Sequence, residues 1–194
     1  MLGTTIYNMA LNLKHKALKG VQIVQLKGGI SHSQSNTYAY EVVELFSEAF
    51  STVGRYLPLP VMFDTVQIKE LIEKDKHIKK ILDLGRQANI AVFTVGTVKN
   101  DALLFRLGYI DKKDRDIIQN RAVGDICSRF FDAQGNICDK ELDERTVGIK
   151  LEELKAKEKR ILVAGSQRKI TAIKGYDEYN FPHLNIIHHS LFRV

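Results

Sequence analysis

Four short segments of the sequence place glycine beside hydroxyl or basic side chains where a helix is predicted to start or a strand to end. They are GTT at 3–5, KGG at 27–29, GTV at 96–98 and GSQRK at 165–169. Backbone N–H groups at helix starts attract anions, threonine hydroxyls add donors, and lysine or arginine supplies positive charge. The chemistry that these residue types suit is the binding of a phosphate-like anion.

Other chemistries have less support in the pattern. Neither G-x-x-x-x-G-K-[ST] nor G-x-G-x-x-G occurs, so the sequence carries neither of these phosphate-binding signatures. Cys127 and Cys138 do not have metal-ligand spacing, and the neighbouring His188 and His189 lack a third ligand. We therefore expect no metal and no cofactor, and we expect a cytoplasmic protein with reduced, unreactive thiols.

The net charge of +6 and the pI near 9.2 do not by themselves indicate a nucleic-acid surface. Basic residues are interleaved with acidic ones, as in KELIEKDKHIKK at 69–80, which is typical of solvated helix faces. Hydrophobic residues make up 44% of the 194 residues, enough for the core of one globular domain. No apolar run approaches the ~20 residues of a membrane span, and no signal peptide is evident.

Strands and helices are predicted to alternate along the chain. The segment ANIAVFTVG at 88–96 has the near-continuous apolar run of a parallel strand covered on both faces. Pro58 and Pro60 place the strand-like segment 56–63 at a sheet margin or entry loop, and residues 122–132 are expected to be irregular. The alternation predicts an α/β fold with a mainly parallel sheet flanked by helices. Further strands are expected at 21–27 and 160–164, and helices at 5–16, 37–53, 69–87, within 101–120 and after 165.

The carboxyl ends of parallel strands meet at one edge of a sheet, where α/β proteins bind ligands. We expect the anion-binding side chains to gather at this edge. The ordinary alternatives are a helix cap for the threonines and a solvated surface position for the basic residues. The candidate phosphate ligands are Thr4, Thr5, Lys27, Arg106, Arg168 and Lys169.

Six segments, taken in order, resemble one protein family. AVGDICSRFFDAQGNICD at 122–139, together with GTTIYNMA, VQIVQLKGG, FTVGTV, LDERTVGI and ILVAGSQRK, resembles the C-terminal effector-binding domain of SorC-type bacterial transcription regulators. The resemblance covers about residues 3–174. It implies the fold also found in ribose-5-phosphate isomerase and glucosamine-6-phosphate deaminase. It also implies a sugar-phosphate-sensing domain that follows an N-terminal helix-turn-helix.

The resemblance implies roles for individual residues. The GTT segment matches the family's phosphate-cradling turn, and Gln34 matches a position that hydrogen-bonds sugar hydroxyls. Asp125 matches an acidic position near the sugar, and its ordinary alternative is an ion pair with Arg121 or Arg129. Lys27 matches a position that faces the effector. A lysine partly removed from water there can ion-pair a phosphate, or condense with an open-chain sugar aldehyde as a Schiff base, since burial lowers its pKa.

Both ends of the sequence depart from the family. In the family a first central strand precedes GTT, and a helix, a strand and a final helix follow the segment that corresponds to AIKG at 172–175. Here the sequence begins at MLGTT and ends in YDEYNFPHLNIIHHSLFRV. We expect one sugar-binding domain over 1–194 that lacks the helix-turn-helix and the first strand, with an aberrant tail at 175–194.

The expected function is non-catalytic binding of a phosphorylated sugar, with deoxyribose 5-phosphate as the first candidate. The partners would be further copies of the chain or a full-length regulator in a mixed oligomer, and the chain by itself would bind neither nucleic acid nor membrane. Two alternatives stay open. One is a sugar-phosphate isomerase-like enzyme, which rests on fold analogy and Asp125. The other is a non-functional fragment of a regulator gene that is destabilised by its missing strand.

Overall fold

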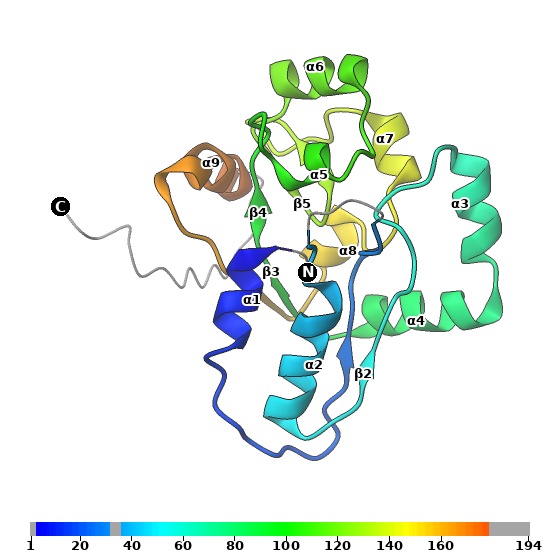
Figure 1. Ribbon diagram of the computed structural model, residues 1–194, viewed down its shortest axis with the longest axis vertical. Coiled ribbons are helices and arrows are strands. Elements are labelled where there is room, and N and C mark those ends of the chain that lie inside the picture. The colour runs from blue at the N-terminus through cyan, green and yellow to red at the C-terminus, as the bar shows by residue number, and fades with distance from the viewer. Residues whose placement is uncertain (1–2, 32–35, 179–194) are drawn as a thin grey trace.

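The computed structural model of the protein describes residues 3–31 and 36–178 (Figure 1). Gln34 and residues 179–194, which make up most of the expected tail, lie outside the described residues. Residues 175–178 are the last turn of the final helix. The helices are α1 (Thr4–Ala10), α2 (Ala39–Phe50), α3 (Val66–Glu73), α4 (Lys76–Gln87), α5 (Leu103–Arg106), α6 (Lys112–Arg121), α7 (Lys140–Arg145), α8 (Leu151–Lys155), the 3₁₀ helix η1 (Gln167–Lys169) and α9 (Ile170–Glu178).

Short strands alternate with these helices, as the α/β prediction requires. β1 (Ile23–Val24) pairs in parallel with β2 (Gly54–Arg55), and β3 (Ile90–Phe93) pairs in parallel with β7 (Lys159–Leu162). A third sheet is antiparallel and consists of β4 (Val95–Gly96), β5 (Gly124–Ile126) and β6 (Arg129–Phe131). The predicted α/β class is therefore correct, and the expected mainly parallel sheet is supplemented by an antiparallel meander.

The strand predicted at 88–96 is two strands that belong to different sheets. Ala91 and Phe93 are completely buried beside β7, and Phe93 accepts a hydrogen bond from the Val163 amide at 2.7 Å. After Thr94 the chain leaves β7, and Gly96 pairs with Asp125 of β5. The apolar run correctly indicated burial, but it carries no signal for this change of partner.

Residues 122–132 form a hairpin, not the irregular segment expected from the sequence. β5 and β6 are joined by Cys127 and Ser128, which both have positive φ angles, 53° and 69°. Two central residues with positive φ are what a tight two-residue hairpin turn needs, and asparagine or glycine usually supplies them. Because neither residue type is present, the turn could not be recognised from the sequence.

Two predicted helices are shorter than expected because the chain finds other hydrogen bonds. The helix predicted at 5–16 ends at Ala10, and the Lys16 amide donates instead to the Ala49 carbonyl near the end of α2, at 2.6 Å. The helix predicted at 69–87 is split into α3 and α4. Asp75 caps α4, since its Oδ1 accepts from the His77 and Ile78 amides at 2.8 and 3.1 Å.

The main core lies between the sheets and α9. Phe93, Ile126, Phe131 and Leu162 are each at most 1% exposed, and Tyr176 of α9 packs on Phe93 with ring centroids 5.8 Å apart. Figure 1 shows α9 on one side of β4 and the pair α3 and α4 on the opposite side of the molecule. The starts of α1, α5 and η1 line one cavity together with β4.

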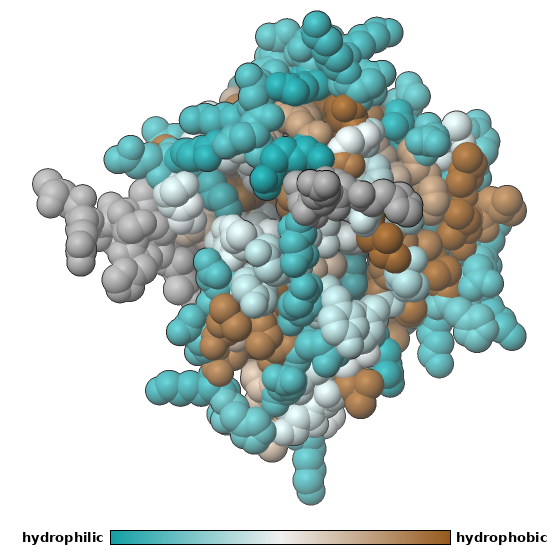
Figure 2. Space-filling view, viewed as in Figure 1, coloured by the Kyte–Doolittle hydropathy of each residue, from teal (hydrophilic) through white to brown (hydrophobic). Residues whose placement is uncertain are grey.

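Outside the core, the expected margin position of segment 56–63 is confirmed. It forms only isolated bridges, between Ile30 and Pro60 and between Met62 and Thr146. On the face drawn in Figure 2, hydrophobic side chains gather at the edge where α3 lies, and Leu71 of α3 is 71% exposed. No helix among residues 3–31 and 36–178 is both long enough and apolar enough to cross a membrane.

Candidate functional site

A cavity of about 340 Å³ opens where α1, β4, α5 and η1 come together. Its lining comes from sequence segments around residues 3–5, 94–97, 101–106 and 166–169, with Lys27, Asn36 and Asp125 added from three further places. Seven of the eight residues predicted from the sequence line it, and the eighth, Gln34, lies outside the described residues. The seven are Thr4, Thr5, Lys27, Arg106, Asp125, Arg168 and Lys169.

The deep end of the cavity holds Lys27 and Asp125, which are bridged by Ser128. Lys27 is 4% exposed, and its Nζ donates a hydrogen bond to Ser128 Oγ. The backbone N–H of Ser128 donates to Asp125 Oδ2 at 3.0 Å. Ser128 therefore fixes the lysine with its side chain and the carboxylate with its backbone. The alternative for Asp125 is not found, because in the described part of the chain Asp125 forms no ion pair with Arg121 or Arg129, and Arg129 pairs with Asp143 at 2.7 Å.

Burial shifts the titration of both groups. It lowers the pKa of the Lys27 ammonium, and the nearby Asp125 carboxylate only partly opposes this. It raises the pKa of the Asp125 carboxyl, against the opposing charge of Lys27 and the Ser128 hydrogen bond. Both shifts favour neutral forms. The pair therefore offers an amine that gives up its proton more readily than an exposed lysine does, next to a carboxylate that takes one up more readily.

Gly96 allows the Asp125 carboxylate to lie against β4. A Cβ atom at residue 96 would lie 1.8 Å from Asp125 Oδ1, so no other residue fits without displacing the carboxylate. The predicted GTV segment thus has a steric role in the site. Its glycine makes room for a side chain that is supplied by another strand.

Lys27 is held in place by residues 146–149, which run beside it. Lys27 forms an isolated bridge with Gly148, and a Cβ at Gly148 would lie 2.5 Å from the Lys27 Cα. Gly148 also has a φ of +118°, which favours glycine. Of the predicted strand 21–27, only Ile23–Val24 forms a β-strand (β1). The Lys27–Gly148 bridge holds the end of the predicted segment in place.

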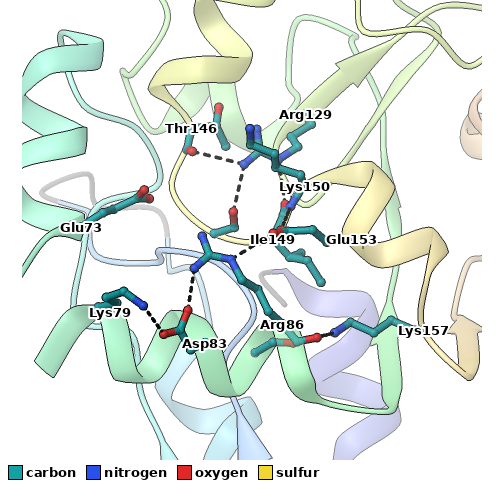
Figure 3. Close-up of polar contacts among 12 residues, drawn as sticks. Glu73, Lys79, Asp83, Arg86, Arg129, Thr146, Ile149, Lys150, Glu153 and Lys157 are labelled. Carbon is teal, nitrogen blue, oxygen red and sulfur yellow. Dashed lines mark hydrogen bonds and ion pairs between the residues drawn. The ribbon is translucent and has the colours of Figure 1, made fainter. Parts of the chain in front are cut away.

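Arg129 organises that segment from inside the protein. It is 1% exposed, and its guanidinium donates to the carbonyls of residues 143, 146, 148 and 149 at 2.7 to 3.3 Å. Figure 3 shows the contact with the Thr146 carbonyl. With the Asp143 carboxylate as counter-ion, Arg129 ties the β5–β6 hairpin to the loop that supports Lys27. Sequence reasoning gave Arg129 no such role, because nothing local to RFFD signals contacts with residues 143–149.

The outer part of the cavity is rich in hydroxyls and positive charge. Lys169 Nζ donates to Thr5 Oγ1 at 3.1 Å and to Thr94 Oγ1 at 3.0 Å. Burial lowers the pKa of Lys169, and Asp125 opposes this. Thr4 and Thr5 form the first turn of α1 and do not cap it, because the N-cap residue is Gly3, with a φ of 104°. Their hydroxyls are thus not used as helix caps.

Two arginines lie at the edge of the cavity. Arg106 is the last residue of α5 and is exposed, and Arg168 in η1 pairs with Asp101. Asp101, Thr94 and Ser128 are functional residues that the sequence pattern did not predict. Asp101 and Thr94 lie close to the GTV segment at 96–98, and this proximity is the one signal for them in the sequence. In the described part of the chain, no group of His, Cys, Asp and Glu side chains could hold a metal ion.

Comparison with known proteins gives a consistent picture. A family described as "Putative sugar-binding domain" matches residues 1–187. The deoxyribonucleoside regulator of Bacillus subtilis is 57% identical over 173 residues, which cover 89% of this chain and 55% of that protein. The chain spans about half the length of the curated relatives it matches.

Solved structures agree with the fold. A domain of a "possible sugar-binding transcriptional regulator" from Arthrobacter aurescens superimposes with a TM-score of 0.86 at 27% identity, over 96% of this chain and 72% of that one. The full-length sorbitol operon regulator SorC from Klebsiella pneumoniae superimposes with a TM-score of 0.85 at 20% identity, over 96% of this chain and 61% of that one. The latter likeness supports the fold alone.

Proposed function

Since the chain belongs to the family of sugar-binding domains found in SorC-type transcriptional regulators, we propose that its cavity binds a phosphorylated sugar as an effector. The observation that carries the proposal is the meeting of Lys27, Asp125 and Lys169 in one cavity, although they are far apart in the sequence. Their charges and hydroxyl neighbours match a ligand that is anionic at one end and polyhydroxylated at the other.

The charges of the cavity favour a phosphate group. Lys27, Arg106, Arg168 and Lys169 contribute four positive charges, and Asp101 and Asp125 contribute two negative ones when all six groups are ionised. We place the phosphate at the outer end, near Lys169, Thr5 and Thr4, where hydroxyl donors and positive charge coincide. The sugar hydroxyls would then lie toward Asp125, whose carboxylate can accept their hydrogen bonds.

Lys27 gives the deep end a second property. A buried amine with a lowered pKa can attack the aldehyde carbon of an open-chain sugar. Attack forms a C–N bond, the carbonyl oxygen leaves as water after protonation, and a C=N bond remains. Asp125, which lies beside the same hydrogen-bonded turn, can transfer the protons that this step needs. We propose this imine as a mode of effector binding, with no turnover.

Deoxyribose 5-phosphate is the first compound to test, because the similar Bacillus regulator is named for deoxyribonucleosides. A thermal-shift panel should contain this compound, ribose 5-phosphate, glucosamine 6-phosphate and unphosphorylated deoxyribose. A ligand at a hundred times its Kd adds about 2.7 kcal/mol to stability, so the binding compound should raise Tm by about 5 °C or more. Equal shifts with phosphorylated and unphosphorylated sugar would contradict the proposal.

The imine has its own test. Borohydride reduction in the presence of deoxyribose 5-phosphate should leave a stable adduct on Lys27, located by peptide mass spectrometry. Lys27→Met should abolish the adduct, whereas Lys80→Met, an exposed lysine on α4, should not. An adduct spread over surface lysines, or no adduct, would show that Lys27 does not form the imine. The thermal shifts would then test non-covalent binding alone.

The proposal assigns binding and not catalysis. Ribose 5-phosphate and glucosamine 6-phosphate should therefore be recovered unchanged after prolonged incubation with the protein. We further propose that the domain acts in the cytoplasm as a homo-oligomer or in a mixed oligomer with a full-length regulator. Light scattering with and without deoxyribose 5-phosphate checks the oligomeric part of this proposal.

A further inference from the structure

An ion pair links two sides of the cavity mouth. Nη2 of Arg168 donates to both carboxylate oxygens of Asp101, at 2.6 Å to Oδ2. Asp101 lies between β4 and α5, and Arg168 lies in η1, so the contact joins two separate segments of the cavity lining. The two side chains are 59% and 51% exposed, which places the pair at the opening and not in the interior.

A second arginine acts on the same carboxylate. Hydrogen bonds from Arg168 lower the pKa of Asp101, and the charge of Arg106 acts in the same direction. The Asp101 carboxylate is thus an anion, supplied by the protein itself, that interacts with the positive charges of Arg168 and Arg106. A carboxylate and a phosphate bind a guanidinium through the same kind of paired N–H···O contacts.

We propose that Asp101 is a built-in competitor for the phosphate of the ligand. Its carboxylate binds Arg168 when no ligand is bound, and an incoming phosphate displaces the carboxylate and binds Arg168, with Arg106 beside it. This inference rests on the proposed function and adds to it an internal anion that weakens ligand affinity. An exposed ion pair holds its partners weakly, so a phosphate dianion can displace it.

The opposite role for Asp101 makes a different prediction. If the ion pair served to hold the cavity walls in a binding-ready position, its loss would loosen the site and weaken binding. If Asp101 competes with the ligand, its loss frees Arg168 and removes a negative charge that repels phosphate. The sign of the change in affinity therefore separates the two roles.

The experiment is calorimetric titration of the wild type and of Asp101→Asn with deoxyribose 5-phosphate and, separately, with inorganic phosphate. We expect Asp101→Asn to bind both ligands about three- to tenfold more tightly, with a smaller gain in 0.5 M salt. Asp64→Asn is the matched control, because it makes the same charge change at an exposed residue outside the cavity, and it should change the affinity less than twofold. Arg168→Gln should weaken binding and abolish the gain from Asp101→Asn.

Unchanged or weaker binding by Asp101→Asn, or an equal gain in Asp64→Asn, would overturn the competitor role. The two proposals can fail separately. If Asp101→Asn strengthens the binding of inorganic phosphate but deoxyribose 5-phosphate does not bind, the proposed sugar-phosphate ligand is wrong and the competitor role of Asp101 stands. If deoxyribose 5-phosphate binds wild type and Asp101→Asn equally well, the competitor role is wrong and the proposed ligand stands.

Discussion

Gly96 and Asp125 face each other across the β4–β5 pair so closely that a Cβ at residue 96 would lie 1.8 Å from Asp125 Oδ1. Gly96→Ala should therefore push the carboxylate away from Ser128 and out of its place in the cavity. We expect deoxyribose 5-phosphate to bind at least about tenfold more weakly, since a charge-assisted hydrogen bond is lost, and overpacking to lower stability by about 1–3 kcal/mol. Titration calorimetry and urea unfolding measure the two effects.

Gly85→Ala is the matched control for Gly96→Ala. Gly85 lies in α4, where an added Cβ would meet its nearest neighbour at 3.5 Å. Alanine favours a helix over glycine by about 1 kcal/mol, so this variant should be slightly more stable and bind the ligand normally. Normal binding by Gly96→Ala would show that the position of the Asp125 carboxylate does not matter to the ligand.

Two arginines in Figure 3 should differ sharply in their contribution to stability. Arg129 is buried and donates to four backbone carbonyls and the Asp143 carboxylate. Arg129→Met leaves these acceptors without a donor, so we expect a loss of about 3–5 kcal/mol in the free energy of unfolding. Arg86 pairs with Asp83 and Glu153 at the surface, and Arg86→Met should lose far less. Urea unfolding curves give both values.

If Arg129→Met does not fold, Arg129→Lys supplies the test. Lysine keeps the buried charge but cannot reach all the carbonyls at once, so an intermediate loss of stability is expected. Equal stability of the Arg129 and Arg86 variants would mean that the 143–149 loop supports Lys27 without help from the hairpin.

The two thiols should be unreactive in the folded protein. Cys127 is buried, and burial raises its pKa. Burial and the charge of Asp132 raise the pKa of Cys138 to about 11. At pH 8 only about one Cys138 in a thousand is then a thiolate, and the thiolate is the reactive form.

We expect labelling with a thiol reagent such as DTNB to be slow at pH 8 and to accelerate about tenfold for each pH unit up to pH 10. Complete labelling in urea is the control that both thiols are reduced. Fast labelling of the folded protein at pH 8 would contradict the burial of Cys127 and the raised pKa of Cys138.

The sequence predicted those features that depend on residues close together in the chain. Glycine beside threonine or lysine at element ends correctly located the segments that line the cavity, including Thr5, Lys27 and Lys169. Apolar patterning also identified the buried strand segment around Phe93.

Non-local contacts could not be predicted in the same way. The Cys127–Ser128 turn lacks the usual turn residues, and Ser128 is held there by hydrogen bonds with Lys27 and with the Asp125 carboxylate. The hydrogen bond from Lys27 to Ser128 joins residues about a hundred positions apart. The Arg168–Asp101 pair is likewise set by the tertiary fold, which brings η1 and the turn before α5 together.

The most direct test of the account is calorimetric titration with deoxyribose 5-phosphate of the wild type, Lys169→Met and Lys174→Met. Lys169 binds Thr5 and Thr94 at the cavity, whereas Lys174 is exposed on α9. We predict one site per chain in the wild type and in Lys174→Met, at least about tenfold weaker binding in Lys169→Met, and no binding of unphosphorylated deoxyribose. Equal affinity in all three proteins, or equal affinity for the sugar without its phosphate, would contradict a phosphate-binding cavity at Lys169.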